Sequence, residues 1–353
     1  MTDTMLAAVF NGEGRLDLEQ RPVPSIQRPD DIVIRVRAVG ICGSDLHILD
    51  VPATHPAKPG VIFGHEFCGE IVEAGPEVRD ISVGDHVAVD QNPPCGRCEA
   101  CRTGSPNFCE VVFHNPECDL PGWPHTPGQW WDGGMASHVR VPSYFAYRVE
   151  PSTPMEHVVV AEPLGCVLNG IRKAGVKAGE TAVVIGGGPI GLLAVMVLKH
   201  LGAGKVVIVE PSEARRNVAL GLGADVGIDP RAGDVVTDVR TATNGRGPTL
   251  IYEAVGSQLD AAVAMSANEA RIVVVGINSA VRADFSPVDI VTKELSIHGA
   301  FLMRNTMREA LDLIESGAIP VGEIVSHVLP LEDVHRGMRL ARSGEALKVV
   351  FTP

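Results

Sequence analysis

The first part of the chain alternates hydrophobic and polar side chains over short stretches that glycine and proline interrupt. The alternation is clear at residues 32–39, 69–74 and 86–89. A two-residue period places apolar side chains on one face of an extended chain, which is typical of strands with one buried face. The pattern therefore predicts an antiparallel, β-rich domain over residues 1–156.

The rhythm changes after about residue 157, where short apolar runs alternate with segments long enough for helices. These runs are residues 181–185, 206–209, 226–228, 250–252 and 272–275. Strands that alternate with helices are joined by right-handed crossovers and form a parallel sheet. We therefore predict the α/β fold class, with a doubly wound parallel sheet over residues 157–294.

The last part of the chain leaves that rhythm. It contains a stretch at 295–301, a helical pattern at 306–315 and a closing strand at 347–351. We expect residues 295–353 to return to the first domain and complete it.

Composition places the chain among globular proteins and limits its partners. Its 353 residues are 45% hydrophobic and 21% charged, with a formal net charge of -13, which suffices for two domains with substantial cores. Duplex DNA and anionic membranes need clustered Lys and Arg, and the sequence shows no such cluster. We expect a cytosolic protein, because the N-terminus lacks the basic start and long apolar stretch of a secretory signal.

One uncharged segment, residues 181–198, reaches the lower length limit of a membrane-spanning helix. Its middle, Gly186-Gly-Gly-Pro-Ile-Gly191, would break a spanning helix in two. We interpret the segment as a strand, a turn and a helix, with a membrane span as the minor alternative.

Four of the eight cysteines lie in one short run, at Cys95, Cys98, Cys101 and Cys109. Thiols this close cannot all pair as unstrained disulfides, and a reducing cytosol would not keep them oxidised. Iron–sulfur motifs of similar appearance end in a gap of three and then Cys-Pro, which this run lacks. A closed, four-thiolate structural zinc site fits best, and iron–sulfur and disulfide sites are the alternatives.

A glycine-rich turn gives the strongest cofactor signal, because it follows an apolar strand and opens an apolar helix. Gly186 permits the tight turn, Gly188 lets the backbone approach a pyrophosphate, and Gly191 lets the helix pack on the strand. Glu210, at the end of the next strand, would accept from ribose hydroxyls and repel a 2′-phosphate, which favours NAD. Arg215, just beyond, could reach a phosphate, so NADP is the alternative cofactor. A weaker alternative is that this is a glycine turn of an ordinary α/β protein with no cofactor.

Two glycine-flanked clusters carry ligands of the kind that catalytic zinc prefers. One contains Cys42, Ser44 and His47, and the other contains His65 and Glu66. Taken alone, Cys42 could be a core cysteine and His65 a loop histidine. Together, a thiolate, an imidazole and a carboxylate supply three protein ligands and leave one exchangeable position on the metal.

These motifs, with the four-cysteine run and Val160-Ala-Glu162-Pro-Leu, resemble those of the zinc-dependent medium-chain dehydrogenases. The likeness is narrower to the polyol (sorbitol), threonine and butanediol branch, and it spans Met5 to Phe351. It implies a GroES-like catalytic domain with a structural zinc lobe at about 92–112, and a Rossmann NAD-binding domain. It also implies two zinc ions per chain, and we expect a homo-oligomer, tetramer or dimer.

The resemblance further implies site roles. Cys42, His65 and a carboxylate would hold the catalytic zinc, and family members differ on whether the residue matching Glu66 or Glu162 is the direct ligand, so both are candidates. Cys166 lies four positions late for the third ligand of liver-type enzymes and is expected in the core.

The same resemblance makes Ser44 and His47 a proton relay from a dry site to solvent. The alternatives without a catalytic role are that Ser44 is a turn residue and that His47 is a surface histidine. Asp45 is expected to accept a hydrogen bond beside the zinc. We expect the cofactor to contact Gly186, Gly188, Pro189, Ile190, Gly191, Glu210, Arg215, Val255, Gly276 and Ile277.

The expected reaction is hydride transfer from a secondary alcohol, such as a polyol, sugar derivative or hydroxy amino acid, to NAD. Sorbitol-type enzymes usually carry Arg-Tyr after the residue matching Phe301, where this chain has Leu302-Met303. The loop at 113–134 is expected to border the pocket with its tryptophans, or else to be anchored by them. His114, Cys118 and His125 are expected to be incidental loop residues, and Cys68 and Cys118 to be packing or loop residues.

Two other functions stay open. Within enzymes, the alternative is an NADP-dependent sugar or primary-alcohol dehydrogenase. From a different class, the alternative is a nucleotide-binding or structural protein that has lost catalysis, for which the intact set of Cys42, Ser44, His47, His65 and Glu66 has no obvious purpose.

Overall fold

The computed structural model describes residues 3–114 and 123–353. The chain forms two compact units. The first contains Met1–Glu162, Met307–Gly317 and Val321–Pro353, and the second contains Pro163–Thr306 and Ala318–Pro320. Both ends of the chain therefore belong to the first unit.

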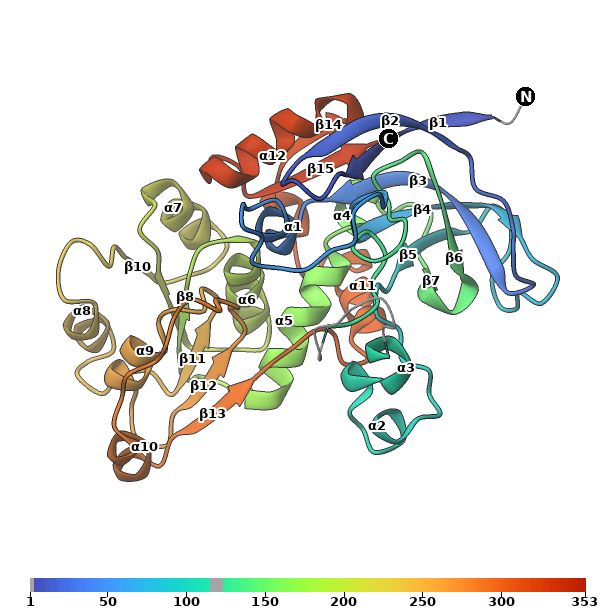
Figure 1. Cartoon of the computed structure of the whole chain (residues 1–353). Coiled ribbons are helices and arrows are strands. Elements are labelled where there is room, and N and C mark those ends of the chain that lie inside the picture. The colour runs from blue at the N-terminus through green and yellow to red at the C-terminus, as the bar shows by residue number, and fades with distance from the viewer. Residues whose placement is uncertain (1–2, 115–122) are drawn as a thin grey trace. The chain divides into compact units, whose positions relative to one another are not determined.

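The first unit is built on a seven-stranded sheet in the order β14-β15-β3-β4-β5-β7, with β6 also paired to β3 (Figure 1). All its neighbours are antiparallel except β14 and β15, so the predicted antiparallel β-rich domain is confirmed. The strands are β3 (Asp31–Gly40), β4 (Glu66–Ala74), β5 (His86–Val89), β6 (His138–Pro142), β7 (Ala146–Arg148), β14 (Val325–Pro330) and β15 (Lys348–Thr352). A separate antiparallel pair is β1 (Thr4–Phe10) with β2 (Leu16–Pro22).

The core of this unit explains the position of β3 inside the sheet. Along β3 only Arg35 and Arg37 are exposed, and the other side chains are buried. Ile32 and Ile34 join a cluster that includes Phe351 of the closing strand. Burying each such side chain contributes about 1.5–3 kcal/mol, so apolar packing holds the closing strand to β3.

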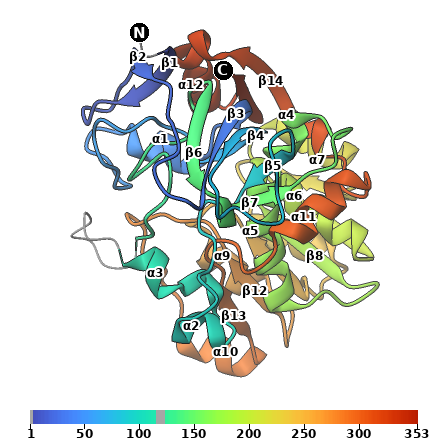
Figure 2. The ribbon, with the colours of Figure 1, turned by 90° about the vertical axis from the view of Figure 1, so that its right-hand side faces the viewer.

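Short helices flank the sheet. They are α1 (Gly43–Ile48), α2 (Glu99–Arg102), α3 (Glu110–Phe113), α4 (Met155–Val158), α11 (Met307–Glu315) and α12 (Val334–Ser343), with 3-10 turns η1 (Pro106–Phe108), η2 (Ser143–Phe145), η3 (Val321–Ile324) and η4 (Leu331–Asp333). The helices α2 and α3 lie side by side and belong to the four-cysteine lobe (Figures 1 and 2). The helix α4 packs on β3 and β4, which keeps residues past the expected boundary at 156 in the first unit.

The second unit holds a six-stranded, fully parallel sheet in the order β10-β9-β8-β11-β12-β13. Its strands are β8 (Thr181–Ile185), β9 (Lys205–Val209), β10 (Val226–Ile228), β11 (Leu250–Glu253), β12 (Arg271–Val274) and β13 (Ser296–Gly299). Its helices are α5 (Ala161–Ala174, whose first two residues lie in the first unit), α6 (Pro189–His200), α7 (Glu213–Gly221), α8 (Val235–Ala242), α9 (Leu259–Met265) and α10 (Pro287–Lys293). This is the doubly wound order of dinucleotide-binding folds, as predicted.

The structure departs from the predicted pattern at β13, because the alternation does not stop at residue 295. The strand β13 is a sixth parallel strand beside β12. It stands at the sheet edge and carries only one apolar side chain, Ile297, between Ser296 and His298. An edge strand with so little apolar character gives no run that sequence reasoning can recognise.

The uncharged segment at 181–198 is divided among β8, the glycine turn and α6, as predicted. Within residues 3–114 and 123–353, no helix combines the length and apolar character needed to cross a bilayer.

Candidate functional site

Three segments far apart in the sequence meet at one end of the main sheet of the first unit. The register places Gly40, the last residue of β3, opposite Glu66 on β4 and opposite Val350 on β15. Cys42 follows β3, His65 precedes β4, and Lys348 begins β15. The sheet register is therefore what gathers the chemically active side chains.

The thiol of Cys42, the imidazole of His65 and the carboxylate of Glu66 each offer a ligand atom within 4.8 Å of the other two. His65 and Glu66 are buried, and Cys42 is half-buried. This donor set suits a catalytic zinc site, because three protein ligands leave one position for an exchangeable group.

Asp45 holds two of these ligands in place. It is fully buried, its Oδ2 accepts a hydrogen bond from the backbone N–H of Cys42 at 2.9 Å, and its Oδ1 lies 3.2 Å from Nδ1 of His65. The Nε2 of His65 is thereby left for a metal, as in other carboxylate–histidine–metal arrangements.

The charges around His65 indicate that this site favours a cation. Burial alone would lower the pKa of His65, yet the negative charges of Asp45 and Cys42 raise it well above its usual value. Either a proton on His65 or a metal ion on its Nε2 would offset the same excess of negative charge.

Glu66 already has one cationic partner, the ammonium of Lys348, and both side chains are almost completely buried. The same Nζ donates to the carbonyl of Ile41 at 2.9 Å. Burial opposes the charge on Lys348, but Glu66 and Cys42 raise its pKa above the usual value. A Cβ on Gly40 would come within 2.5 Å of Oε2 of Glu66, so a larger residue there would displace the two charged groups of this ion pair.

Glu162 lies at the start of α5, is buried, and adds to the negative charge that raises the pKa of Lys348. Its Oε1 accepts a hydrogen bond from Nε2 of Gln91. The Oε1 of Gln91 is buried and has no hydrogen-bond partner among the residues that the structure describes. Glu162 is thus held by a neutral amide, whereas Glu66 is held by an ammonium.

The expected relay residues lie on α1. Ser44 is half-buried in its first turn. His47 lies one turn later with its side chain 55% exposed. The helix therefore leads from the buried ligand cluster towards solvent.

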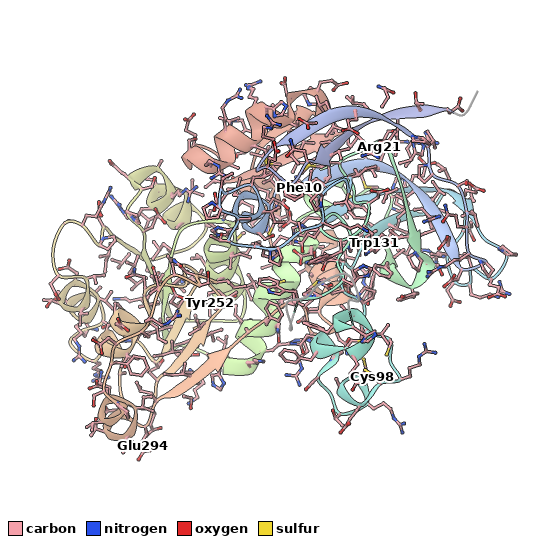
Figure 3. All side chains as sticks on the ribbon, viewed as in Figure 1. Phe10, Arg21, Cys98, Trp131, Tyr252 and Glu294 are labelled. Atoms are coloured by element: carbon pink, nitrogen blue, oxygen red, sulfur yellow. The ribbon has the colours of Figure 1, made fainter. Side chains whose placement is uncertain are left out.

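The four cysteines of the lobe bring all their sulfur atoms within 4.8 Å of one another. Sulfur pairs Cys95–Cys101 and Cys98–Cys109 are 4.0 Å apart, close to the ~3.8 Å expected around a tetrahedral zinc with ~2.3 Å bonds. The backbone N–H of Arg97 lowers the pKa of Cys95 to about 6, which favours a thiolate. Figure 3 labels Cys98 within this lobe.

The glycine-rich turn of the second unit has the conformation that its sequence predicts. Gly186 adopts φ 101, and Gly188 precedes α6 at its N-terminal cap. A Cβ on Gly191 would come within 1.8 Å of the carbonyl oxygen of Gly186, so only glycine allows this helix to approach the strand. Pro189 and Ile190 form the first turn of α6.

The remaining cofactor candidates follow the carboxyl ends of neighbouring parallel strands. Val255 comes after β11, and Gly276 and Ile277 come after β12. Val255 and Ile277 are large apolar side chains that are exposed, and a Cβ on Gly276 would collide with backbone atoms of Val255 and Gly256. This sheet edge is where open α/β folds bind ligands.

Glu210 is buried behind the glycine turn. One of its oxygens accepts from the backbone N–H of Gly187, and the other accepts from that of Ser212 at 2.8 Å. Arg216 is engaged by Asp229 at 3.3 Å and by backbone carbonyls. Arg215 lies in the first turn of α7.

The three tryptophans of the loop at 113–134 make different contacts. Trp130 is buried. Trp131, labelled in Figure 3, packs edge-on against Phe145 with ring centroids 5.6 Å apart and donates to the carbonyl of His125. These two therefore anchor the loop. Trp123 instead meets the ring of His55 edge-on at 4.4 Å.

The remaining histidines and cysteines considered above form no further group of potential metal ligands among the described residues. Neither His114 nor His125 belongs to a group of potential metal ligands among the described residues, and Cys118 lies outside them. Cys68 is buried, donates to the carbonyl of Met155 at 3.2 Å, and has a pKa raised by burial. Cys166 is half-buried on α5.

Comparison with known proteins gives these observations a family. Residues 28–151 match the alcohol dehydrogenase GroES-like domain, and residues 189–316 match the zinc-binding dehydrogenase domain. The chain is 32% identical over 348 residues to an L-threonine 3-dehydrogenase of Bacillus licheniformis, covering 97% of this chain and 96% of that protein. The chain belongs to the zinc-binding alcohol dehydrogenase family.

Two further relatives fit this membership. A sorbitol dehydrogenase of Bacillus subtilis is 30% identical over 355 residues, covering 99% of this chain and 97% of the relative. A Sinorhizobium meliloti 1021 protein, described as a zinc-binding dehydrogenase and solved with NADP, has a TM-score of 0.90 and 31% identity, covering 99% and 100% of the two chains.

This zinc-binding alcohol dehydrogenase is therefore an oxidoreductase that acts on CH–OH groups with zinc and a nicotinamide cofactor. The expected family and fold are confirmed. Sequence reasoning missed Lys348 and Gln91. A lysine that opens an otherwise apolar closing strand was a usable signal for the first, whereas nothing in the sequence marks Gln91.

The Lys348–Glu66 contact predicts a large effect on stability. Lys348→Met should lower the free energy of unfolding by ~3 kcal/mol, because it leaves Glu66 as an uncompensated buried charge. Adding Glu66→Gln should recover most of that loss. Urea denaturation of the metal-free variants, in which no zinc can compensate Glu66, measures both, with Lys199→Met, which breaks a half-exposed pair with Asp225, as a control worth under ~1 kcal/mol. Equal losses in the single and double variants would contradict this account.

His55 predicts a pH dependence. Burial lowers its pKa to about 4, below the ~6.5 of an unfolded chain, and its Nδ1 lies 3.1 Å from the carbonyl oxygen of Pro56. Between these two pKa values, His55 is therefore protonated in the unfolded state and neutral in the folded state. Stability should fall by ~2–3 kcal/mol between pH 7 and pH 4.5 for this residue alone. Urea unfolding should show that decrease reduced in His55→Gln, and an unchanged pH dependence would refute it.

Proposed function

We propose that this dehydrogenase oxidises a secondary hydroxyl of a polyol, sugar derivative or hydroxy amino acid to a ketone, with NAD as the hydride acceptor. We also propose two zinc ions per chain, one at Cys42, His65 and a carboxylate and one at the four cysteines. A cytosolic homo-oligomer, dimer or tetramer, is part of the proposal.

The observation that carries the proposal is the gathering of Cys42, His65 and Glu66 within 4.8 Å at the end of the main sheet. Zinc held there would act as a Lewis acid that lowers the pKa of an alcohol hydroxyl. Asp45 orients His65 and Cys42 through its two oxygens. The Lys348–Glu66 pair limits the negative charge beside the reacting oxygen.

The proton that leaves the alcohol needs a carrier, and the two polar residues on α1 supply one. Ser44 stands two residues past Cys42 and is half-buried, so its hydroxyl can accept a proton from the site and give one up. His47, further along the same helix, is exposed, and an imidazole can accept a proton and release it to solvent. The proposed path therefore runs from Ser44 to His47 and into solvent.

Polar groups favour a substrate with more than one hydroxyl. The Oε1 of Gln91 is a buried acceptor that no described residue satisfies, and a second substrate hydroxyl would supply the missing donor. The sequence departs from sorbitol-type enzymes at Leu302-Met303. The side chain of Met303 is buried and fills the space that a side chain on Gly165 would need. We therefore place the substrate in the polyol class without assigning sorbitol.

The choice of NAD rests on Glu210. Its carboxylate is fixed by two backbone N–H groups, and a buried carboxylate there repels a 2′-phosphate. The neighbouring Arg216 is already bound to Asp229. The relative solved with NADP makes NADP the alternative to be tested.

The metal assignment predicts a selective loss. Cys42→Ser should reduce bound zinc from about two to about one per chain and lower kcat by ~1,000-fold or more, because the Lewis acid is lost. Its far-UV circular dichroism and its NADH affinity should stay unchanged. Metal analysis and turnover measure this, with Cys166→Ser as the matched control. Full activity in Cys42→Ser, or about one zinc per wild-type chain confined to the cysteine lobe, would reject catalysis at this site.

The cofactor assignment predicts a preference that depends on Glu210. Wild-type kcat/KM should be ~100-fold higher with NAD than with NADP, and Glu210→Ala should narrow the ratio to below ~10 by removing ribose acceptors and the repulsion. The control is Glu213→Ala, which removes an acidic side chain three residues further along the chain and should leave the ratio of the two kcat/KM values unchanged. The rates come from NADH or NADPH absorbance with a panel of polyols, inositols and 3-hydroxy amino acids. Equal use of both cofactors by the wild type would overturn the assignment.

A further inference from the structure

A line of three charged or titratable side chains runs from α1 to α12 within the first unit. The Nδ1 of His47 lies 3.4 Å from Oδ2 of Asp50. The other oxygen of Asp50, Oδ1, accepts a hydrogen bond from Nη1 of Arg342 at 2.6 Å. Arg342 comes from 292 residues further along the chain, so only the fold brings these three groups together.

The side-chain contacts of His47 all lie at one ring nitrogen, Nδ1. A carboxylate can only accept, so a hydrogen bond to Asp50 requires the hydrogen on Nδ1, whereas a bare Nδ1 could only accept from a hydroxyl such as that of Thr54. Thr54 Oγ1 lies 3.2 Å from the same Nδ1, and the Thr54 backbone N–H donates to the carbonyl of His47 at 3.1 Å. Both side-chain partners lie at Nδ1, and when Nδ1 donates to Asp50 the lone pair of Nε2 is the proton acceptor.

Arg342 fixes Asp50 in this orientation. While Nη1 binds Asp50, Nη2 donates to the carbonyl of Leu46 at 2.9 Å, so one arm of the guanidinium is tied to α1 and the other to the residue two positions past its end. The hydrogen bond from Arg342 is the main reason why the pKa of Asp50 is lowered. The carboxylate thus stays ionised and cannot simply turn to solvent.

We propose that Asp50, held by Arg342, is a positioning residue that keeps His47 in the Nδ1–H tautomer with Nε2 as the proton acceptor, and stabilises the ring when it is protonated. This inference rests on the relay role given to His47 in the proposed function. It assigns a task to Asp50 and Arg342 that the zinc and cofactor sites do not give them.

Other charged groups near these three side chains either disfavour a proton on His47 or lie beside Arg342. His55 interacts electrostatically with His47, and a proton on either ring disfavours one on the other. Arg342 is itself positive and also borders a surface hollow of about 550 Å³, with Arg15, Asp17, His335 and Arg339. Asp50 is thus the carboxylate that favours a charged His47, and since His47 is half exposed its influence is moderated by solvent.

The first test is the pH dependence of kcat/KM for the holoenzyme, from pH 5.5 to 10. Asp50→Asn should move the acid limb to lower pH and lower the plateau ~3- to 10-fold, because a weaker base accepts the proton less readily. KM for NAD should not change. Asp50→Glu should restore part of the plateau. An Asp50→Asn profile identical to wild type would overturn the proposal.

Arg342 is tested through its dependence on Asp50. Arg342→Met should lower the plateau in the wild-type background but add no further loss to Asp50→Asn, since it acts only through that carboxylate. The matched control is Arg336→Met, which removes an exposed arginine of the same helix that pairs with Asp333 and should leave the profile unchanged. Full additivity of the Arg342 and Asp50 effects would contradict the proposed link.

A spectroscopic measurement separates this proposal from the relay itself. Long-range ¹H–¹⁵N spectra of the zinc-loaded protein, with His47→Gln to assign the signal, should show Nδ1–H and bare Nε2 in the wild type and a mixture of tautomers in Asp50→Asn. A wild-type Nε2–H tautomer would refute the positioning role. If His47→Gln keeps full activity while the tautomer changes as expected, the relay fails and the positioning stands.

Discussion

The buried contact between Lys348 and Glu66 is the interaction on which the candidate zinc site depends. It forms because β15, the last strand of the chain, is inserted beside β3, so that one glycine, Gly40, faces Glu66 on one side and Val350 on the other. A methyl group at Gly40 would strike the Glu66 carboxylate and the Lys348 side chain. Two buried charges are costly unless they are paired and hydrogen-bonded. The strand order, the glycine and the ion pair are therefore a single constraint.

That constraint explains how much of the site could be predicted from sequence. Cys42, His65 and Glu66 stand in short local motifs, and the glycine turn before α6 folds as its residues dictate, so local chemistry sufficed. The parallel sheet followed from alternating apolar runs. Lys348 could not be placed beside Glu66 without knowing that β15 pairs with β3, and polar β13 gave no periodic signal. Sequence reasoning succeeded where neighbours in the chain are neighbours in space, and failed where strand pairing creates the contact.

The partners of the two carboxylates distinguish their electrostatic roles. Glu66 is compensated by the ammonium of Lys348, whereas Glu162 accepts a hydrogen bond from the neutral amide of Gln91. Together with the Cys42 thiolate and Asp45, they make the buried end of the sheet strongly negative, and Lys348 offsets one of those charges. A divalent cation would offset two more, which is consistent with the charge that raises the pKa of His65. The donor set is thus matched to zinc in both ligand type and charge.

The return of the chain to the first unit supplies more than a closing strand. The zinc-ligand and relay residues Cys42, Ser44, His47, His65 and Glu66 lie in the first half of the sequence, yet two cations that contact this region come from the C-terminal segment. Lys348 of β15 reaches the ligand cluster, and Arg342 of α12 reaches Asp50 beside His47. One cation acts in a buried environment and fixes a carboxylate next to the ligands. The other acts at the surface and fixes a carboxylate next to the proposed proton acceptor. The same short segment therefore couples folding of the chain's end to the arrangement of acid and base at the site, so a chain lacking β15 and α12 would keep its motifs and lose their geometry.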